Sequence, residues 1–254
     1  MNFLTLSLTL IFVLIPLILS KTLKLGLEKD SLIATVRSII QLLAVGYILQ
    51  YVFNAEHFLF IVLMVLLMIG AATQNARKKG ASIKGITWKL FVTFVIIEIL
   101  TQGILLGLQI VPPTPQYIIP ISGMVIGNSM VLGILFLNRF IAEVENQQDE
   151  TELILSLGGT PKQAIHRQLI AAIKASTIPT IESQKTIGLV QLPGMMSGQI
   201  IAGADPVQAV QFQLLILFLL LTTAVVTSIM LGYLSYPTLF NQRMQFMKLK
   251  QETE

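Results

Sequence analysis

The sequence predicts an all-α, polytopic membrane bundle of about seven transmembrane helices, and three observations support this fold class. Hydrophobic residues make up 54% of the 254-residue chain and charged residues only 12%, against roughly 25% charged residues in a soluble domain. The apolar residues form long unbroken blocks, which favours helices over the alternating strands of an outer-membrane barrel. Cysteine is absent, so disulfides and thiolate metal sites are excluded. The composition also argues against a disordered chain, a nucleic-acid-binding protein and an ordinary soluble enzyme.

Seven apolar blocks have the length of helices that cross a bilayer, because a hydrocarbon core of about 30 Å needs about 20 helical residues. In chain order they are 3–20, 32–53, 58–76, 90–111, 118–137, 186–204 and 207–234. The first is expected to be a retained helix, since its basic residues follow the apolar run. The segment 169–181 is only moderately apolar, so it is either an interfacial helix or a bent entry into the sixth crossing. We treat 1–254 as a single transmembrane domain.

The basic residues predict which helix ends face the cytoplasm, because cytoplasmic loops carry an excess of Lys and Arg. We place the N-terminus outside, the C-terminus in the cytoplasm and the protein in the cell membrane. Sixteen of the seventeen Lys and Arg residues then fall in inside loops, and none falls in an outside loop. The remaining one, Arg37, lies near the inner end of the second block, where its side chain can reach water. The inside loops are 21–31, 77–89, 138–185 and 235–254.

The long polar stretch 138–168 predicts a helix, a break and a second helix in the cytoplasm. Gly158 and Gly159 can adopt the positive φ that ends a helix. Thr160 then suits the N-cap of the next helix, and Pro161 suits its first position. A short helix held between two membrane crossings is a suitable lever for a soluble partner.

The same stretch resembles the cytoplasmic coupling segment of ABC-transporter permeases. In that motif a Glu begins the segment, a Gly follows six residues later, and Thr-Pro comes next. Leu153 and Ile154 replace the two alanines of the motif, and an ordinary helix–turn–helix loop is the alternative interpretation. The resemblance implies contact with a separate ATPase through Glu152, Leu157, Gly158, Thr160, Pro161 and Gln163.

Further stretches resemble the FetB-type permeases, in order and over almost the whole chain. They are Arg37 to Leu42, Pro120 to Met130, Ile178 to Thr180 and Lys185 to Gly198. This family comprises half-transporter permeases that work with a separate ATPase, which binds ATP and Mg²⁺. Its bacterial members are implicated in iron export and its plant members in aluminium tolerance, with UDP-glucose as one proposed substrate.

The resemblance implies the permease subunit of an ABC-type exporter, which moves a metal cation, iron above all, out of the cytoplasm. The expected partners are an ATPase subunit, a second copy of this chain and the lipid bilayer, and no nucleic acid. The sequence contains no Gly-x-x-x-x-Gly-Lys-Ser/Thr phosphate loop, so we expect no enzyme activity and no cofactor in this chain itself. The alternatives are a nucleotide-sugar permease, a secondary transporter that runs without ATP, a membrane-embedded enzyme, and a scaffold or receptor.

Ionisable side chains inside a membrane are costly, so each one is a functional candidate. Glu98 lies in the fourth block near mid-bilayer, and its carboxylate suits a hard cation such as ferrous iron. The alternative is a protonated Glu98, or one paired with Arg37, Gln102 or another polar group. Glu182 is the second candidate metal ligand: it either collects cations at the inner mouth or pairs with Lys185 at helical spacing.

The remaining pathway candidates are polar or break a helix. Asn128 lies among glycines that are also explained by close helix packing. Pro193 and Gly194 interrupt the sixth block, which would expose backbone carbonyls at membrane depth. Arg37 and Gln41 open a matched stretch, where Arg37 would balance a carboxylate near the entrance. Arg37 with Lys185 would instead suit the phosphate of a nucleotide sugar.

Overall fold

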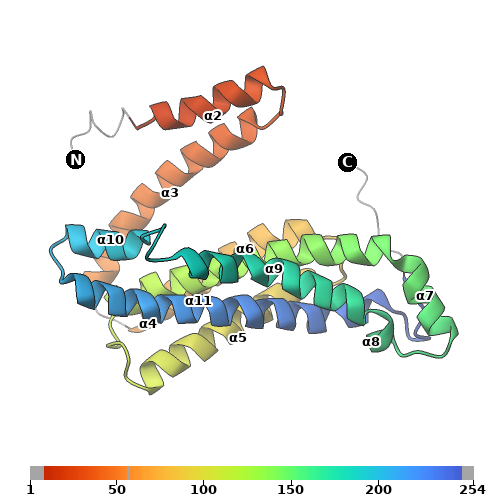
Figure 1. The fold of residues 1–254 in the computed structure, drawn as a ribbon. Coiled ribbons are helices and arrows are strands. Elements are labelled where there is room, and N and C mark those ends of the chain that lie inside the picture. The colour runs from red at the N-terminus through yellow and green to blue at the C-terminus, as the bar shows by residue number, and fades with distance from the viewer. Residues whose placement is uncertain (1–8, 56–57, 248–254) are drawn as a thin grey trace. The chain divides into compact units, whose positions relative to one another are not determined.

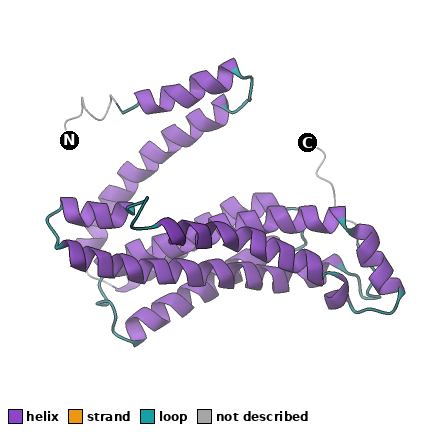
Figure 2. Ribbon diagram, in the orientation of Figure 1, coloured by secondary structure: helices purple, strands orange, loops and turns teal. Residues whose placement is uncertain are grey.

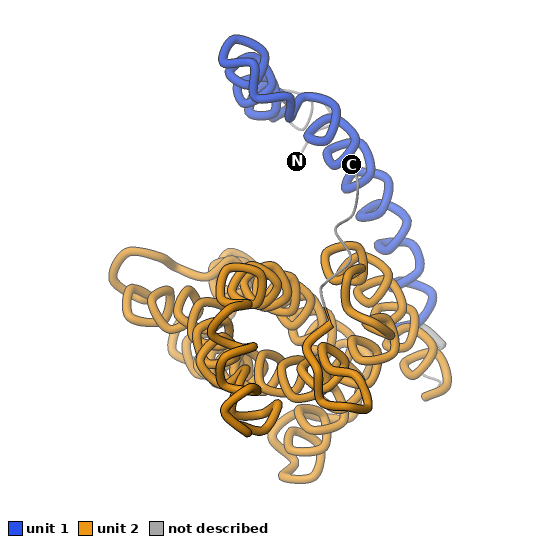
Figure 3. The backbone as a smooth tube through the Cα atoms, turned by 90° about the vertical axis from the view of Figure 1, so that its right-hand side faces the viewer, with its two compact units in different colours: residues 1–57 blue, residues 58–254 orange. Residues whose placement is uncertain are grey.

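A computed structural model describes residues 9–55 and 58–247, and these residues form helices joined by turns, with no strand among them (Figure 2). Residues 3–8 of the first predicted block, residues 56–57 and the end of the basic tail, 248–254, lie outside the described residues. The chain divides into two compact units, residues 1–57 and 58–254 (Figure 3).

The first unit is a helical hairpin of α2 (Ile11–Thr22) and α3 (Glu28–Ala55). Its turn is held by Ser20, whose hydroxyl donates to Glu28 Oε1 at 2.8 Å and accepts from the Leu27 amide at 3.2 Å. With 28 residues, α3 is about 42 Å long, which exceeds the thickness of a bilayer core. The second predicted crossing therefore corresponds to α3.

The second unit is built from long helices that lie alongside one another (Figure 1). They are α4 (Phe58–Ala76), α5 (Ile86–Gly107), α6 (Pro115–Asn146), α9 (His166–Thr186) and α11 (Pro206–Ser235). Within the described part of the chain, five segments have the length and hydropathy of membrane spans. Those five are Glu28–Phe53, Phe58–Gly80, Ile86–Gly107, Pro115–Asn146 and Pro206–Leu239. The predicted all-α, polytopic membrane bundle is confirmed.

The crossing predicted at 186–204 is wrong, because the chain runs along the bundle earlier, in α9. This helix has 21 residues, about 31 Å, and packs against both α6 and α11. The following helix, α10 (Gly194–Ile201), has eight residues, about 12 Å, which is too short to cross. The segment 169–181 is therefore the middle of a continuous helix. Hydropathy missed α9 because exposed charged residues such as Lys174 and Glu182 lower its mean hydropathy, while other residues of the helix pack against its neighbours.

α11 packs closely against α9 and α6 at Gly232. A Cβ atom added there would lie 2.5 Å from Leu169 Cδ1 on α9 and 3.3 Å from Phe136 Cζ on α6. A hydrogen bond of 2.8 Å between the hydroxyls of Ser176 and Ser228 joins α9 to α11 one turn away. Small residues and buried hydroxyls of this kind are how helices pack without a hydrophobic driving force in lipid.

Candidate functional site

The predicted coupling segment folds as α7 (Gln148–Ser156), a two-glycine turn and α8 (Pro161–Ala164). Gly158 has φ of 85°, a conformation that L side chains rarely adopt. The Gly159 amide donates to Ile154 O at 2.9 Å, and a Cβ on Gly159 would lie 2.5 Å from Ile154 Cγ2. Each glycine is therefore required for its own reason, and the predicted break is confirmed.

The start of α8 is a capping box. The Thr160 amide donates to Gln163 Oε1 at 2.8 Å, and the Gln163 amide donates to Thr160 Oγ1 at 3.4 Å. Pro161 occupies the first helical position, where its missing N–H costs no hydrogen bond. The local structure expected for these three residues is confirmed, and their contact with an ATPase stays a prediction.

The coupling segment is tied to the start of α9 and presents one face outward. Arg167 Nη1 lies 2.6 Å from Glu150 Oε1, and Gln168 Nε2 donates to Thr151 Oγ1 at 3.2 Å. On α7, Leu153 is 58% exposed and Leu157, at the end of the helix, is 79% exposed. The exposed Glu152 lies beside them in the sequence. We call Glu152, Leu153 and Leu157 the α7 face.

A second set of polar residues lies inside the bundle, between α5 and α6. Gln102 Nε2 donates to Ser122 Oγ at 2.9 Å, and the Ser122 hydroxyl donates to Glu98 Oε1. Glu98 is 6% exposed and Ser122 is fully buried. Glu98 is about 18 Å along α5 from Ile86, which corresponds to mid-bilayer. The expected association of Glu98 with Gln102 is therefore present, and Ser122 links the two side chains. We call Glu98, Gln102 and Ser122 the buried polar cluster.

Two acceptors in this cluster have no donor among the described residues. They are the second carboxylate oxygen, Glu98 Oε2, and the amide oxygen Gln102 Oε1. A buried acceptor left unpaired costs about 1–3 kcal/mol, so these two oxygens favour a proton donor or a small cation as a third component. Among the described residues, no group of three or more His, Asp or Glu side chains could hold a metal ion. A cation at Glu98 therefore needs amide, hydroxyl or water oxygens as further ligands.

Asn128 connects α6 to α11 at a different level. Its Nδ2 atom donates to Thr223 Oγ1 at 2.9 Å, and Thr223 is fully buried. The Thr223 hydroxyl in turn donates to Leu220 O at 2.9 Å. Asn128 therefore holds two helices together, and its predicted role in the pathway stays a prediction.

The other candidate residues are dispersed. Lys185 Nζ lies 2.7 Å from Glu182 Oε1, so the pairing weighed from the sequence is present. Glu182 belongs to the last turns of α9, away from the coupling segment, and its expected place at the inner mouth stays a prediction. Pro193 and Gly194 begin α10 and do not interrupt a crossing.

Arg37 and Gln41 lie one turn apart on α3, in the first unit. Both line a shallow recess of about 400 Å³ on that helix, together with aliphatic side chains. Arg37 and Gln41 are exposed. Their proposed part in a pathway stays a prediction.

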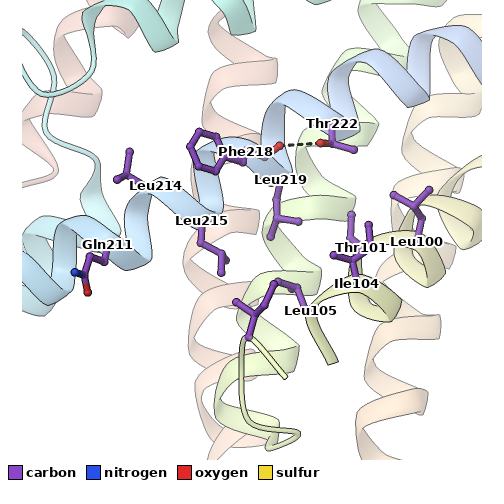
Figure 4. Close-up of a pocket in the computed structure, with 11 residues that line it drawn as sticks. Leu100, Thr101, Ile104, Leu105, Gln211, Leu214, Leu215, Phe218, Leu219 and Thr222 are labelled. Atoms are coloured by element: carbon purple, nitrogen blue, oxygen red, sulfur yellow. Dashed lines mark hydrogen bonds between the residues drawn. The ribbon is translucent and has the colours of Figure 1, made fainter. Parts of the chain in front are cut away.

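A groove of about 390 Å³ lies between α5 and α11. Some of its lining residues follow Glu98 closely in the sequence, but the groove differs in chemistry from the buried polar cluster. Figure 4 shows that aliphatic side chains and Phe218 make up most of its lining. Thr101 and Thr222 also line it, and both hydroxyls donate to carbonyls of their own helices, at 2.8 and 2.9 Å. The groove is therefore mostly apolar, with Gln211 as a further polar side chain in its lining.

Sequence reasoning missed Ser122 and Thr223, which complete the two polar contacts. Ser122 lies within the matched stretch Pro120 to Met130, and this was the available signal for it. Thr223 is a hydroxyl in an apolar block, and such residues usually bond their own helix. Only the packing of α6 on α11 distinguishes Thr223 from its neighbours.

The fold and these polar sites define a multi-pass membrane protein with buried polar groups between its spans. The family described as "Uncharacterised protein family (UPF0014)" matches residues 3–240, and the chain belongs to this family.

Three named relatives match the chain over nearly its full length. It is 58% identical to the "UPF0014 membrane protein YjkA" of Bacillus subtilis, over 96% of this chain and 98% of that protein. It is 41% identical to the "Probable iron export permease protein FetB" of Escherichia coli, over 95% and 93%. It is 34% identical to "Protein ALUMINUM SENSITIVE 3" of Arabidopsis thaliana, over 93% and 86%. No solved structure matches. The family relationship identifies the chain as a membrane permease.

Ser122→Ala tests whether the buried polar cluster is a bonded unit. The change leaves Glu98 Oε1 and Gln102 Nε2 without their shared partner, so the free energy of unfolding should fall by about 1–3 kcal/mol. Ser129→Ala is the matched control, because Ser129 is equally buried on α6 but its hydroxyl has no partner among the described residues. Thermal unfolding in detergent measures both variants. Equal stability of the two would show that the cluster does not act as a unit.

Proposed function

We propose that the chain is the permease subunit of an ABC-type exporter, driven by a separate ATPase, with a metal cation such as iron as substrate. The coupling segment carries this proposal. Its two-glycine turn and capping box fix α7 and α8 in one geometry, and the α7 face is presented to a partner. The Escherichia coli relative is named a "Probable iron export permease protein", which supports iron as the substrate.

The α7 face has the chemistry of a protein-binding surface. Leu153 and Leu157 are four residues apart, so their side chains lie on the same side of α7. Leu157 lies at a helix end within the polar stretch 138–168, which the basic residues assign to the cytoplasm. Exposed leucines in water favour a partner that covers them. Because Glu150 and Thr151 of α7 bond the start of α9, a push on this face is transmitted to a bundle helix.

The exposed side of α9 supports a pathway between two copies of the chain. Lys174, Ile178 and Glu182 are spaced four residues apart and are all exposed. Charged side chains on a helix that lies beside membrane spans face protein or water, since lipid contact is costly. Two copies that bring this side of α9 together would enclose a polar passage. Movement of α9 by the ATPase would then open the passage to one side or the other.

Leu157→Asp tests the coupling role. A charge at the most exposed leucine of α7 should disrupt an apolar contact and reduce co-purification of the ATPase and ATP-dependent flux at least about tenfold. Leu189→Asp is the control, since Leu189 is 91% exposed in the turn after α9, at the far end of that helix. Retention of both ATPase binding and flux by Leu157→Asp would contradict the coupling role.

Glu98→Gln tests the cation site in proteoliposomes that contain the permease and its ATPase. The amide removes the charge but keeps the shape, so ATP-dependent ferrous iron flux should fall at least about tenfold. Asp205→Asn is the control, because Asp205 caps α11 through the amides of Val207 and Gln208, and Asn caps equally well. Other divalent metals and UDP-glucose are offered in parallel. Undiminished metal flux in Glu98→Gln, or flux of UDP-glucose alone, would contradict a metal pathway through Glu98.

A secondary transporter is the second candidate, and one observation favours it. Glu98 Oε2 is buried without a hydrogen-bond donor among the described residues, which suits a carboxylate that takes up and releases a proton. Flux driven by a pH gradient in vesicles without ATP would support this function. In that case Leu157→Asp would leave flux unchanged, whereas Glu98→Gln would abolish it.

A further inference from the structure

A strongly basic segment joins α4 to α5 and takes no part in either polar site. Five cationic residues fall within 77–89, and the chain from 58 to 97 contains no Asp or Glu. Within the described part of the chain, no carboxylate lies at ion-pair distance from any of these five cations. The segment is therefore an uncompensated positive patch at a membrane boundary. Its cations are Arg77, Lys78, Lys79, Lys84 and Lys89.

The patch lies beside two neighbouring recesses. The first has a volume of about 600 Å³ and is lined by Arg77, Lys78, Lys84 and Thr87, among others. The second has a volume of about 690 Å³ and extends between α4 and α5 past Trp88. Arg77 and Thr87 line both. A basic mouth thus continues into a recess along the two membrane helices.

The turn that shapes this mouth is fixed by packing. Gly80 lies so close to α5 that a Cβ on it would be 2.8 Å from Ile86 Cγ1. Ile83 is 2% exposed, and its amide donates to Gly80 O at 2.9 Å. Gly85 has φ of 71° and precedes the first residue of α5. The basic side chains are therefore presented from a preformed turn, which lowers the entropy cost of binding a ligand.

The second recess, which we call the inner recess, is lined by an unpaired polar residue and an aromatic side chain. Thr73 lines the recess and is 5% exposed, and its hydroxyl oxygen has no hydrogen-bond partner among the described residues. Trp88 is 69% exposed and stacks on Phe91, with ring centroids 5.9 Å apart. Trp is enriched at the level of lipid headgroups, where one side of the ring is apolar and the other is wet. This recess therefore combines the Arg77 cation with an exposed aromatic wall.

We propose that these recesses bind an anionic phospholipid, with its headgroup phosphate at Arg77, Lys78 and Lys84 and its glycerol and upper acyl chains beside Trp88. Basic pockets between transmembrane helices on the cytoplasmic side recognise such headgroups. Each basic residue near the surface raises the affinity for anionic lipid by a factor of about five. A free phosphate ion would use the cations but not the inner recess. The two recesses share Arg77 and Thr87, and their combined lining from Lys84 to Phe91 favours a lipid.

The single tryptophan of the chain makes this site directly observable. Trp88 is the only Trp, so its fluorescence reports this recess alone. The full-length chain is placed in phosphatidylcholine nanodiscs that contain a fixed minor fraction of brominated phosphatidylglycerol or brominated phosphatidylcholine. Bromine near the glycerol end of the acyl chains quenches Trp88 on contact. We expect stronger quenching by the anionic lipid, and we expect Arg77→Gln with Lys84→Gln to lower this preference at least about fivefold.

Lys24→Gln with Lys29→Gln is the matched control. It removes the same charge from the loop 21–31, which the positive-inside rule places on the same side, and neither residue lines the two recesses. The control should keep the lipid preference of the parent chain. An unchanged Trp88 spectrum without brominated lipid shows that each variant is folded.

Three results would overturn the proposal. Equal quenching of the parent chain by both lipids would show that there is no anionic-lipid site. Complete relief of quenching by millimolar inorganic phosphate would assign the cations to a free ion. Loss of ATPase binding in Arg77→Gln with Lys84→Gln, with an unchanged lipid preference, would assign the patch to that subunit.

Discussion

The packing of α9 against α6 and α11 is the contact on which the rest of the structure depends. Gly232 leaves room for Leu169, and the hydroxyls of Ser176 and Ser228 close the same interface with a hydrogen bond of 2.8 Å. α9 begins where the coupling segment ends, and its far end leads to α10 (Figure 1). A partner that moves α7 therefore acts on a helix that packs against two long helices of the bundle, α6 and α11.

The cost of polar groups in lipid explains why α9 needs this position. Its buried residues include Gln168, Ser176 and Thr177, which would be poorly accommodated against hydrocarbon. The same cost applies to Glu98, whose second carboxylate oxygen has no donor among the described residues. Both features place polar side chains between helices of the protein, where they are shielded from lipid. A permease requires this arrangement, because its substrate must be shielded from lipid along the whole crossing.

Hydropathy predicted the helices whose composition is set by contact with lipid. It missed the helix whose composition is set by contacts with other parts of the protein. α4, α5, α6 and α11 coincide with predicted blocks because their apolar residues face lipid or one another. α9 does not, since Lys174 and Glu182 lower its hydropathy while Leu169 and Ala172 are buried against its neighbours.

The same distinction applies to the sites. The turn at Gly158 and Thr160 could be predicted because its chemistry is local. The cost of burying an ionisable group likewise singled out Glu98 in the sequence. The link from Glu98 through Ser122 could not be predicted, because it depends on the register between two helices.

The most direct test of the central claim, that α9 lines an aqueous pathway, is thiol labelling of Lys174→Cys, since the chain contains no cysteine. In proteoliposomes with the ATPase, we predict labelling by a membrane-impermeant reagent at a rate that changes with ATP, and no labelling of Leu67→Cys on α4. The account would be contradicted if Lys174→Cys were labelled as little as Leu67→Cys, both with and without ATP.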